Sequence, residues 1–149
     1  MKPFAVIVLA VLAGASCATT GSSSTHPVSV DAAAAGTIAQ IYYWRAKPGK
    51  YDEYTRYVRD VAEPIDAEAH RRGAFLSVTT YMTQDTASLW THMRVFILRD
   101  SAQLRGLSGA LDSAGMRLEP DSVKRRERGQ YSATLRDRVG AATVGILHR

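Results

Sequence analysis

The chain is poor in the residues that most directly mark a site or an anchor. Cys17 is its single cysteine, so an internal disulfide is excluded. The longest apolar run, residues 4–15, is shorter than the roughly 20 residues with which a helix crosses a bilayer. The 19 basic residues outnumber the 14 acidic ones, and much of the excess lies in residues 123–130. Such a run could contact anionic lipid or nucleic acid, but we favour a solvated helix face and do not expect a nucleic-acid partner.

Motifs that carry a defined chemistry are also missing. The sequence contains no G-x-S-x-G nucleophile elbow and no Walker-type phosphate loop. Its 4 histidines lie far apart, and no H-x-x-E or H-x-H pair offers two ligands to a metal. We therefore predict neither a metal site nor a cofactor.

The N-terminus has the features of an export signal. Residues 4–15 follow the basic Lys2 and have the length of the apolar core of a signal peptide. Small residues then lead to Cys17, in a pattern that resembles the lipobox of bacterial lipoproteins, although Gly14 stands where that pattern prefers leucine. The resemblance implies a lipid on Cys17 and a membrane-anchored protein of the cell envelope. The alternative is cleavage at an A-x-A-type site and a soluble periplasmic or secreted protein.

The rest of the chain divides by composition. Residues 17–36 are rich in Ser, Thr, Ala and Gly and nearly lack bulky apolar side chains, so they cannot form a core. Residues 37–149 are enough for one small domain. The predicted organisation is a lipoprotein-type signal peptide (1–16), a flexible tether (17–36) and a single folded domain (37–149).

Hydrophobic periodicity in that domain predicts the element order β-α-β-β-α-(α)-β. Pro64 lies inside a helical pattern that begins at residue 51, and we expect it to kink this helix. Gly73 is expected to end the helix, and Asp100 to cap the next one. Strands are predicted over residues 36–47, 74–83, 88–100 and 142–149, and an additional helix over 121–137.

This order is typical of an α+β, ferredoxin-like βαββαβ fold with an extra C-terminal helix. The stretches KPGKYDEYTRYVRD, RRGAFLSV and FILRDSAQL resemble the dimeric α+β barrel superfamily, which includes antibiotic-biosynthesis-monooxygenase-like domains. The resemblance implies a homodimer in which two sheets pack face to face around a cavity. Its haem-degrading branch uses an asparagine, a helical histidine and a tryptophan. The chain contains no asparagine, so we exclude that activity.

Side-chain alternation divides each strand into two faces. On the third strand, we expect the mostly apolar face to pack on the helices; it carries Leu89, Thr91, Met93, Val95 and Ile97. The opposite face is expected to line the cavity, and it carries Trp90, His92, Arg94 and Phe96. The matching faces of the other strands carry Gln40, Tyr42 and Trp44, and Ser77, Thr79 and Tyr81. Such aromatic and polar faces suit a small-molecule pocket or a dimer interface, and we favour the interface.

The resemblance, together with this placement, implies two alternative functions. The first is a non-catalytic binding or structural homodimer, whose small hydrophobic ligand would contact Gln40, Tyr42, Trp44, Tyr81 and Trp90. The alternative is a cofactor-independent monooxygenase- or isomerase-like enzyme acting on an aromatic or polyketide-like substrate. In that enzyme His92 would be the general base, and Arg94 would stabilise an enolate-like oxygen. The sequence leaves open whether the chain catalyses a reaction and whether residues 121–137 close the cavity.

Overall fold

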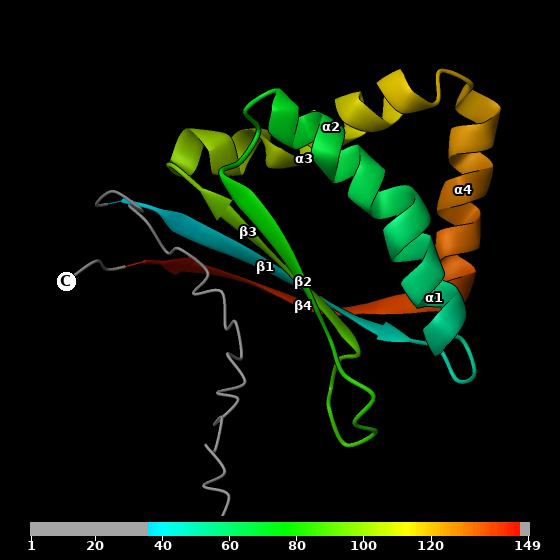
Figure 1. Ribbon diagram of the computed structural model, residues 1–149. Coiled ribbons are helices and arrows are strands. Elements are labelled where there is room, and N and C mark those ends of the chain that lie inside the picture. Colours follow the sequence, from blue (N-terminus) through cyan, green and yellow to red (C-terminus); the bar gives the residue numbers. More distant parts are fainter. Residues whose placement is uncertain (1–35, 147–149) are drawn as a thin grey trace, which may run out of the picture. The chain divides into compact units, whose positions relative to one another are not determined.

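A computed structural model describes residues 36–146, which form a four-stranded antiparallel sheet with helices on one face (Figure 1). The strands lie in the order β2-β3-β1-β4. Their bounds are β1 (Ile38–Ala46), β2 (Ser77–Met82), β3 (His92–Leu98) and β4 (Arg136–Gly145). This is the α+β, ferredoxin-like fold that the sequence predicts. The predicted signal peptide and most of the predicted tether, with Cys17, lie outside the described residues.

The first helical segment is interrupted at the expected place. It consists of α1 (Tyr51–Tyr57), a π-helical turn η1 (Val58–Ala62) and α2 (Glu63–Arg71). Pro64 lies in the first turn of α2, where its missing N–H costs nothing, and the wider π turn precedes it. Gly73 follows with a φ of 76°, a left-handed conformation that favours glycine, and its N–H donates to the carbonyl of His70 at 2.8 Å. The predicted end at Gly73 is confirmed, and the irregularity predicted at Pro64 takes the form of the π-helical turn before it.

Aspartates begin the two later helices, α3 (Ser101–Leu118) and α4 (Ser122–Leu135). The carboxylate of Asp100 accepts from the backbone N–H groups of Ala102 and Gln103 at 2.8 and 2.9 Å, so the predicted cap is confirmed. Asp121 caps α4 in the same way. The end of this helix differs from the prediction, because the chain becomes extended at Arg136 and β4 begins there rather than at residue 142.

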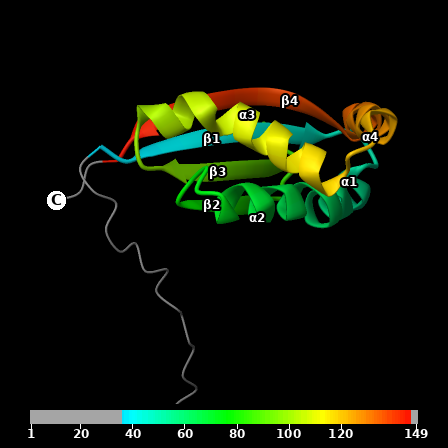
Figure 2. The same ribbon diagram turned by 90° about the horizontal axis from the view of Figure 1, so that it is seen from above.

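The helices occupy one side of the sheet only. α2 and α3 lie side by side over it, and α4 stands at the end of the sheet between α3 and β4 (Figure 2). The main core lies beneath α2 and α3 and includes Phe75, Phe96, Leu98 and Leu107, all at least nine-tenths buried. A second cluster lies beneath α1 and α4 and contains Ala46, Tyr54, Val58 and Leu135.

A charged cluster ties α2 to α3. Glu68 accepts from Nε of Arg72 at 2.7 Å and from Nε of Arg117 at 2.8 Å, and it also pairs with Arg71. These hydrogen bonds, with that of Arg72 the strongest influence, lower the pKa of Glu68 to about 2. The carboxylate is therefore ionised at neutral pH and connects the two helices by charge-assisted hydrogen bonds.

The two faces of β3 are the reverse of the prediction. His92, Arg94, Phe96 and Leu98 are buried toward the helices, whereas Met93, Val95 and Ile97 are partly exposed on the other face. The prediction failed because alternation separates two faces without saying which one the helices cover. The imidazole of His92 and the guanidinium of Arg94 interact with polar side chains of the helices, as described below.

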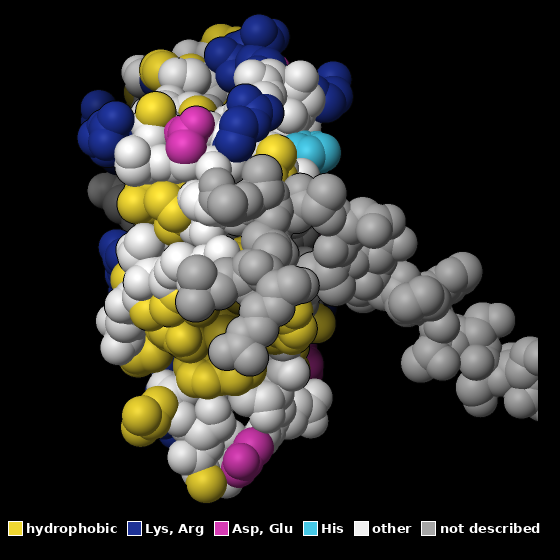
Figure 3. All heavy atoms as spheres, turned by 90° about the vertical axis from the view of Figure 1, so that its left-hand side faces the viewer, with side chains coloured by type: hydrophobic (Ala, Val, Ile, Leu, Met, Phe, Trp, Pro, Cys, Tyr) yellow, Lys and Arg dark blue, Asp and Glu magenta, His cyan; other side chains and the backbone are white. Residues whose placement is uncertain are grey.

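The face away from the helices, here called the open face, is largely apolar. By pairing register, Ile41 and Tyr43 of β1 lie opposite Val95 and Met93 of β3 on this face, and Tyr81 of β2 also pairs with Met93. In Figure 3 Lys and Arg lie at the top, over the helices, and hydrophobic side chains gather lower down, on the side away from them. No helix within residues 36–146 is long and apolar enough to cross a membrane.

Candidate ligand-binding site

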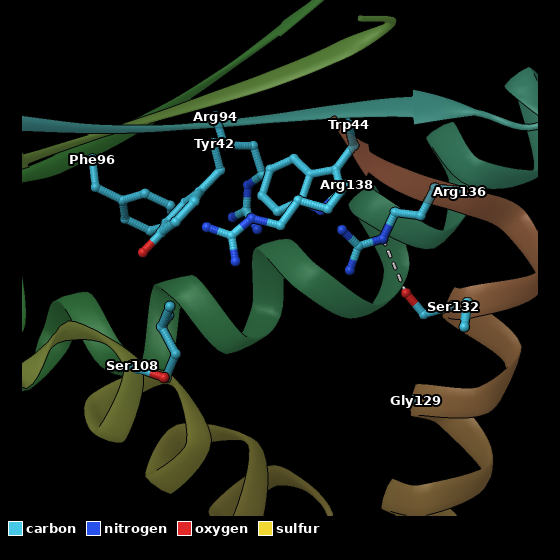
Figure 4. A pocket seen from close by; sticks show the side chains of 11 residues that line it. Tyr42, Trp44, Arg94, Phe96, Ser108, Gly129, Ser132, Arg136 and Arg138 are labelled. Carbon is cyan, nitrogen blue, oxygen red and sulfur yellow. Dashed lines mark hydrogen bonds between the residues drawn. The ribbon is translucent and has the colours of Figure 1, made fainter. Parts of the chain in front are cut away.

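A cavity of about 470 Å³ lies between the helix-facing side of the sheet and helices α3 and α4 (Figure 4). The sheet contributes aromatic rings, and the helices contribute small or apolar side chains. Three arginines project into the same space. Its lining consists of Tyr42, Trp44, Arg94, Phe96, Ser108, Leu111, Gly129, Ser132, Ala133, Arg136 and Arg138. This volume is within the range of small-molecule sites, and α4 forms one of the walls.

A second cavity, of about 480 Å³, adjoins the first on the side of η1 and α2. The two share the lining residues Arg94, Leu111, Gly129 and Arg136. The basic run of α4 contributes to this second cavity through Arg125 and Arg128. Two members of the run therefore face the protein, which leaves a smaller basic surface for nucleic acid or lipid than the sequence suggests.

A β-bulge directs two of the arginines into the first cavity. The register between β1 and β4 shifts after Tyr43, which pairs with Gly140, so that Trp44 pairs with Arg138 and Ala46 with Arg136. Val139 is the additional residue on β4. Without this shift Arg138 would pair with Arg45 and point to the open face. The bulge thus places both guanidinium groups on the face that carries Trp44.

Each of the three guanidinium groups lies over an aromatic ring. The Cζ atom of Arg94 is 5.2 Å from the ring centroid of Phe96. For Arg136 the distance to the Trp44 ring is 4.7 Å, and for Arg138 the distance to the Tyr42 ring is 4.9 Å. Cation–π contacts of this kind hold a guanidinium by its face and leave its edge, with the N–H donors, available.

Arg94 is the most deeply placed of the three. It is 8% exposed and forms an ion pair through Nη2 with Oδ2 of Asp66, itself 4% exposed. Burial lowers the pKa of Arg94 to about 10, so the side chain stays charged at neutral pH. Its Nε has no hydrogen-bond partner within the described part of the chain. Arg94 therefore has a buried donor, Nε, without a protein acceptor among the described residues.

Arg136 and Arg138 have weaker internal partners. Nε of Arg136 donates to Oγ of Ser132 at 3.1 Å, across the cavity wall formed by α4. Within residues 36–146 no carboxylate forms an ion pair with either of these arginines. The first cavity therefore has a positive charge that the surrounding side chains do not fully compensate.

His92, the predicted general base, lies outside both cavities. The imidazole is fully buried between Tyr51 and Tyr54, with Nε2 3.0 Å from Oγ1 of Thr55 and Nδ1 2.9 Å from Oγ1 of Thr91. The Thr55 hydroxyl donates to the carbonyl of Tyr51, so it accepts from Nε2–H. Burial, and to a smaller extent the charge of Arg136, lowers the pKa of His92 to about 4, so the ring is neutral at pH 7. The structure thus gives His92 a place in the core and not beside a substrate.

The other predicted site residues separate into two groups. Tyr42 and Trp44 line the cavity together with Arg94. Gln40 is buried on the same face, but its Oε1 accepts from the Thr143 hydroxyl and it does not line the cavity. Tyr81 and Trp90 belong to the open face: Tyr81 pairs with Met93, and the Trp90 ring lies 6.4 Å from that of Tyr43. Their predicted place beside Arg94 is wrong, because the pairing register puts Thr80, not Tyr81, opposite Arg94, and Trp90 precedes the regular alternation of β3.

Sequence reasoning missed Arg136 and Arg138 because it assigned residue 136 to a helix. Recognition of β4 at its true start would have placed these two residues on one face by their spacing. Metal binding gains no support from this arrangement: within residues 36–146 no group of three His, Cys, Asp or Glu residues could hold a metal ion.

No family model and no curated protein matches the chain. Among solved structures, HapK from Hahella chejuensis matches with a TM-score of 0.51 and 12% identity, over 75% of this chain and 94% of that one. The protein PA3566 from Pseudomonas aeruginosa matches with a TM-score of 0.50 and 18% identity, over 76% and 96%. SnoaB, a cofactor-independent oxygenase from Streptomyces nogalater, matches with a TM-score of 0.44 and 10% identity, over 77% of this chain and 97% of that one. At these identities the likeness shows the fold, and the site must be argued from the chain's own residues.

Proposed function

We propose that the chain is a binding module that holds a small aromatic ligand in the cavity between the sheet and helices α3 and α4. The observation that carries the proposal is the composition of the cavity wall. Tyr42, Trp44 and Phe96 offer flat apolar surfaces, and the arginines offer hydrogen-bond donors. No histidine, cysteine, lysine or carboxylate belongs to this wall, so among the described residues Tyr42 is the one side chain of the wall that could act as a general base.

The enzymatic alternative is weaker on the same grounds. A cofactor-independent oxygenase or isomerase must remove a proton from its substrate, and His92 was the predicted base. That imidazole is enclosed by Thr55, Thr91 and two tyrosine rings. Arg94 retains the position in which a cation would stabilise an oxyanion, but the carboxylate beside it, Asp66, is held in the buried ion pair, so the binding role is the better supported.

The proposal includes a homodimer formed through the open face. A sheet with helices on one side leaves an apolar surface that a second copy of the chain would cover, with Ile41, Tyr43, Met93 and Val95 at its centre. Aromatic and aliphatic side chains are those that stabilise the centre of protein interfaces. In this arrangement the ligand cavities lie on the helix side of each sheet, not between the two sheets.

The proposal also places the protein outside the cytoplasm, on a membrane. This part rests on the sequence of the leader, residues 1–16, and on Cys17 as the site of lipid attachment. A binding domain on a tether of about 20 residues could collect a ligand near the membrane surface.

The cavity can be blocked at one position without disturbing the fold. Gly129 lines both cavities, and a Cβ at this residue meets no atom within 4 Å. Gly129→Leu should fill the space, and it should also stabilise α4 by about 0.5–1 kcal/mol, since glycine is a poor helix former. Gly106→Leu in α3 is the matched control, because its Cβ is equally free of contacts and Gly106 lines neither cavity.

The test is calorimetric titration of the full chain with two aromatic probes, 2-naphthoate and 2-naphthamide. We expect at least one probe to bind to the wild type and to Gly106→Leu, and to bind at least about tenfold more weakly to Gly129→Leu. The proposal is wrong if neither probe binds, or if Gly129→Leu binds as the wild type does.

A further inference from the structure

The charge and the donors around the cavity identify the chemistry of its ligand. We infer that the ligand is an aromatic carboxylate, whose anionic group contacts the edges of Arg94 and Arg136 while its rings lie against Tyr42 and Trp44. The inference rests on the proposed function and adds the charge of the ligand to it.

The first argument is the charge of the cavity wall. Three guanidinium groups line the first cavity, and Asp66 compensates only one of them, Arg94. Arg136 and Arg138 have no carboxylate partner among the described residues. The uncompensated positive charge favours an anion in this cavity and opposes a cation, although solvent reaches the exposed Arg138 and reduces its share of the effect.

The second argument is the unused donor of Arg94. More than nine-tenths of this residue is buried, its Nη2 pairs with Asp66, and its Nε has no acceptor within residues 36–146. A buried donor without an acceptor is destabilising unless a ligand or water satisfies it. Nε itself is closed off from both cavities in this structure, so a bound anion would accept its hydrogen bond only after a small shift of the Arg94 side chain, which lines both cavities.

The third argument is the way in which the arginines are held. Each guanidinium lies over an aromatic ring, which restricts its position before a ligand arrives. A guanidinium edge matches the two oxygens of a carboxylate. The same rings that hold the arginines provide the apolar surface for the body of the ligand, which favours an aromatic acid over a small inorganic anion.

The fourth argument is the bulge at Val139. The bulge shifts the pairing of β4 by one residue, so Arg136 and Arg138 lie on the helix side of the sheet. Without the shift Arg138 would lie on the open face. Bulges are frequent beside binding sites, where they redirect side chains. This irregularity of β4 has the effect of concentrating positive charge in the cavity.

The experiment compares two probes of nearly equal shape, 2-naphthoate and 2-naphthamide, with inorganic phosphate as the non-aromatic anion. We expect the full chain to bind 2-naphthoate at least about 30-fold more tightly than either of the other two. Arg136→Gln should weaken 2-naphthoate about tenfold and leave 2-naphthamide within about twofold. Arg138→Gln removes an exposed charge that does not contact the carboxylate, so it should also weaken 2-naphthoate selectively, but by less. Arg126→Gln, which removes a charge from the exposed side of α4, is the matched control and should leave both affinities unchanged.

The outcomes separate the two levels of the proposal. If both naphthalene probes bind equally and Gly129→Leu weakens both, the cavity is a binding site but the inference about charge is wrong. If phosphate binds as tightly as 2-naphthoate, the aromatic part of the inference is wrong. An equal loss of both probes in Arg136→Gln or Arg138→Gln also overturns it, because the arginines would then act through packing alone. If no probe binds, the proposed function itself fails.

Discussion

The ion pair between Arg94 and Asp66 should be the most sensitive single interaction in the domain. Both side chains lie beneath the sheet and are less than a tenth exposed, at 9% for Arg94 and 5% for Asp66. Asp66→Asn removes the negative charge and leaves a buried guanidinium that is still protonated at neutral pH. Loss of one partner of a buried pair costs about 3–5 kcal/mol, a large part of the roughly 5–15 kcal/mol that stabilises a domain.

Urea unfolding at pH 7, followed by circular dichroism, measures this cost. We expect Asp66→Asn to lower the free energy of unfolding by about 3–5 kcal/mol, whereas the double variant Arg94→Met/Asp66→Leu should lose less than about 1 kcal/mol because no charge remains buried. Asp60→Asn removes the exposed partner of Arg59 and serves as the control, which should unfold close to the wild type. An Asp66→Asn variant as stable as the control, or a double variant as unstable as the single one, would refute the reasoning.

Three other predictions concern the core histidine, the open face and the leader. His92 has a folded-state pKa of about 4 against 6.5 in the unfolded chain, so the unfolded state binds more protons and the protein becomes less stable as the pH is lowered. Between pH 7 and pH 5 the wild type should lose about 2 kcal/mol of unfolding free energy that His92→Gln does not lose, and the same pH dependence in both proteins would contradict this. Val95→Glu should place a charge on the open face and convert a dimer to a monomer in sedimentation velocity, and a monomeric wild type would exclude the proposed dimer. Cys17→Ser should release the protein from the membrane fraction of a bacterial host, and unchanged fractionation would disprove the lipid anchor.

The element order could be predicted because its signals are local. Helical and strand periodicity, the cap by Asp100 and the stop at Gly73 depend only on neighbouring residues, and each is present in the structure. The start of β4 was missed because α4 ends without a glycine or proline. The chain changes directly to extended geometry at Arg136, with φ −150° and ψ 162°.

The site could be predicted only in part, because its position depends on contacts between distant residues. A charged side chain is seldom buried without a partner, so Arg94 was assigned to an open cavity rather than to the helix side. Its partner, Asp66, lies on α2, and nothing in the sequence joins the two. The bulge after Tyr43 is likewise a property of paired strands, and it alone brings Arg138 beside Trp44.

The most direct test of the account is a crystal structure of the full chain grown with 2-naphthoate. The account predicts the naphthalene rings between Tyr42, Trp44 and α4, with a carboxylate oxygen within hydrogen-bond distance of Arg94 or Arg136. Probe density on the open face, or a cavity filled by its own side chains while the probe stays unbound, would contradict the claim that this cavity is the binding site.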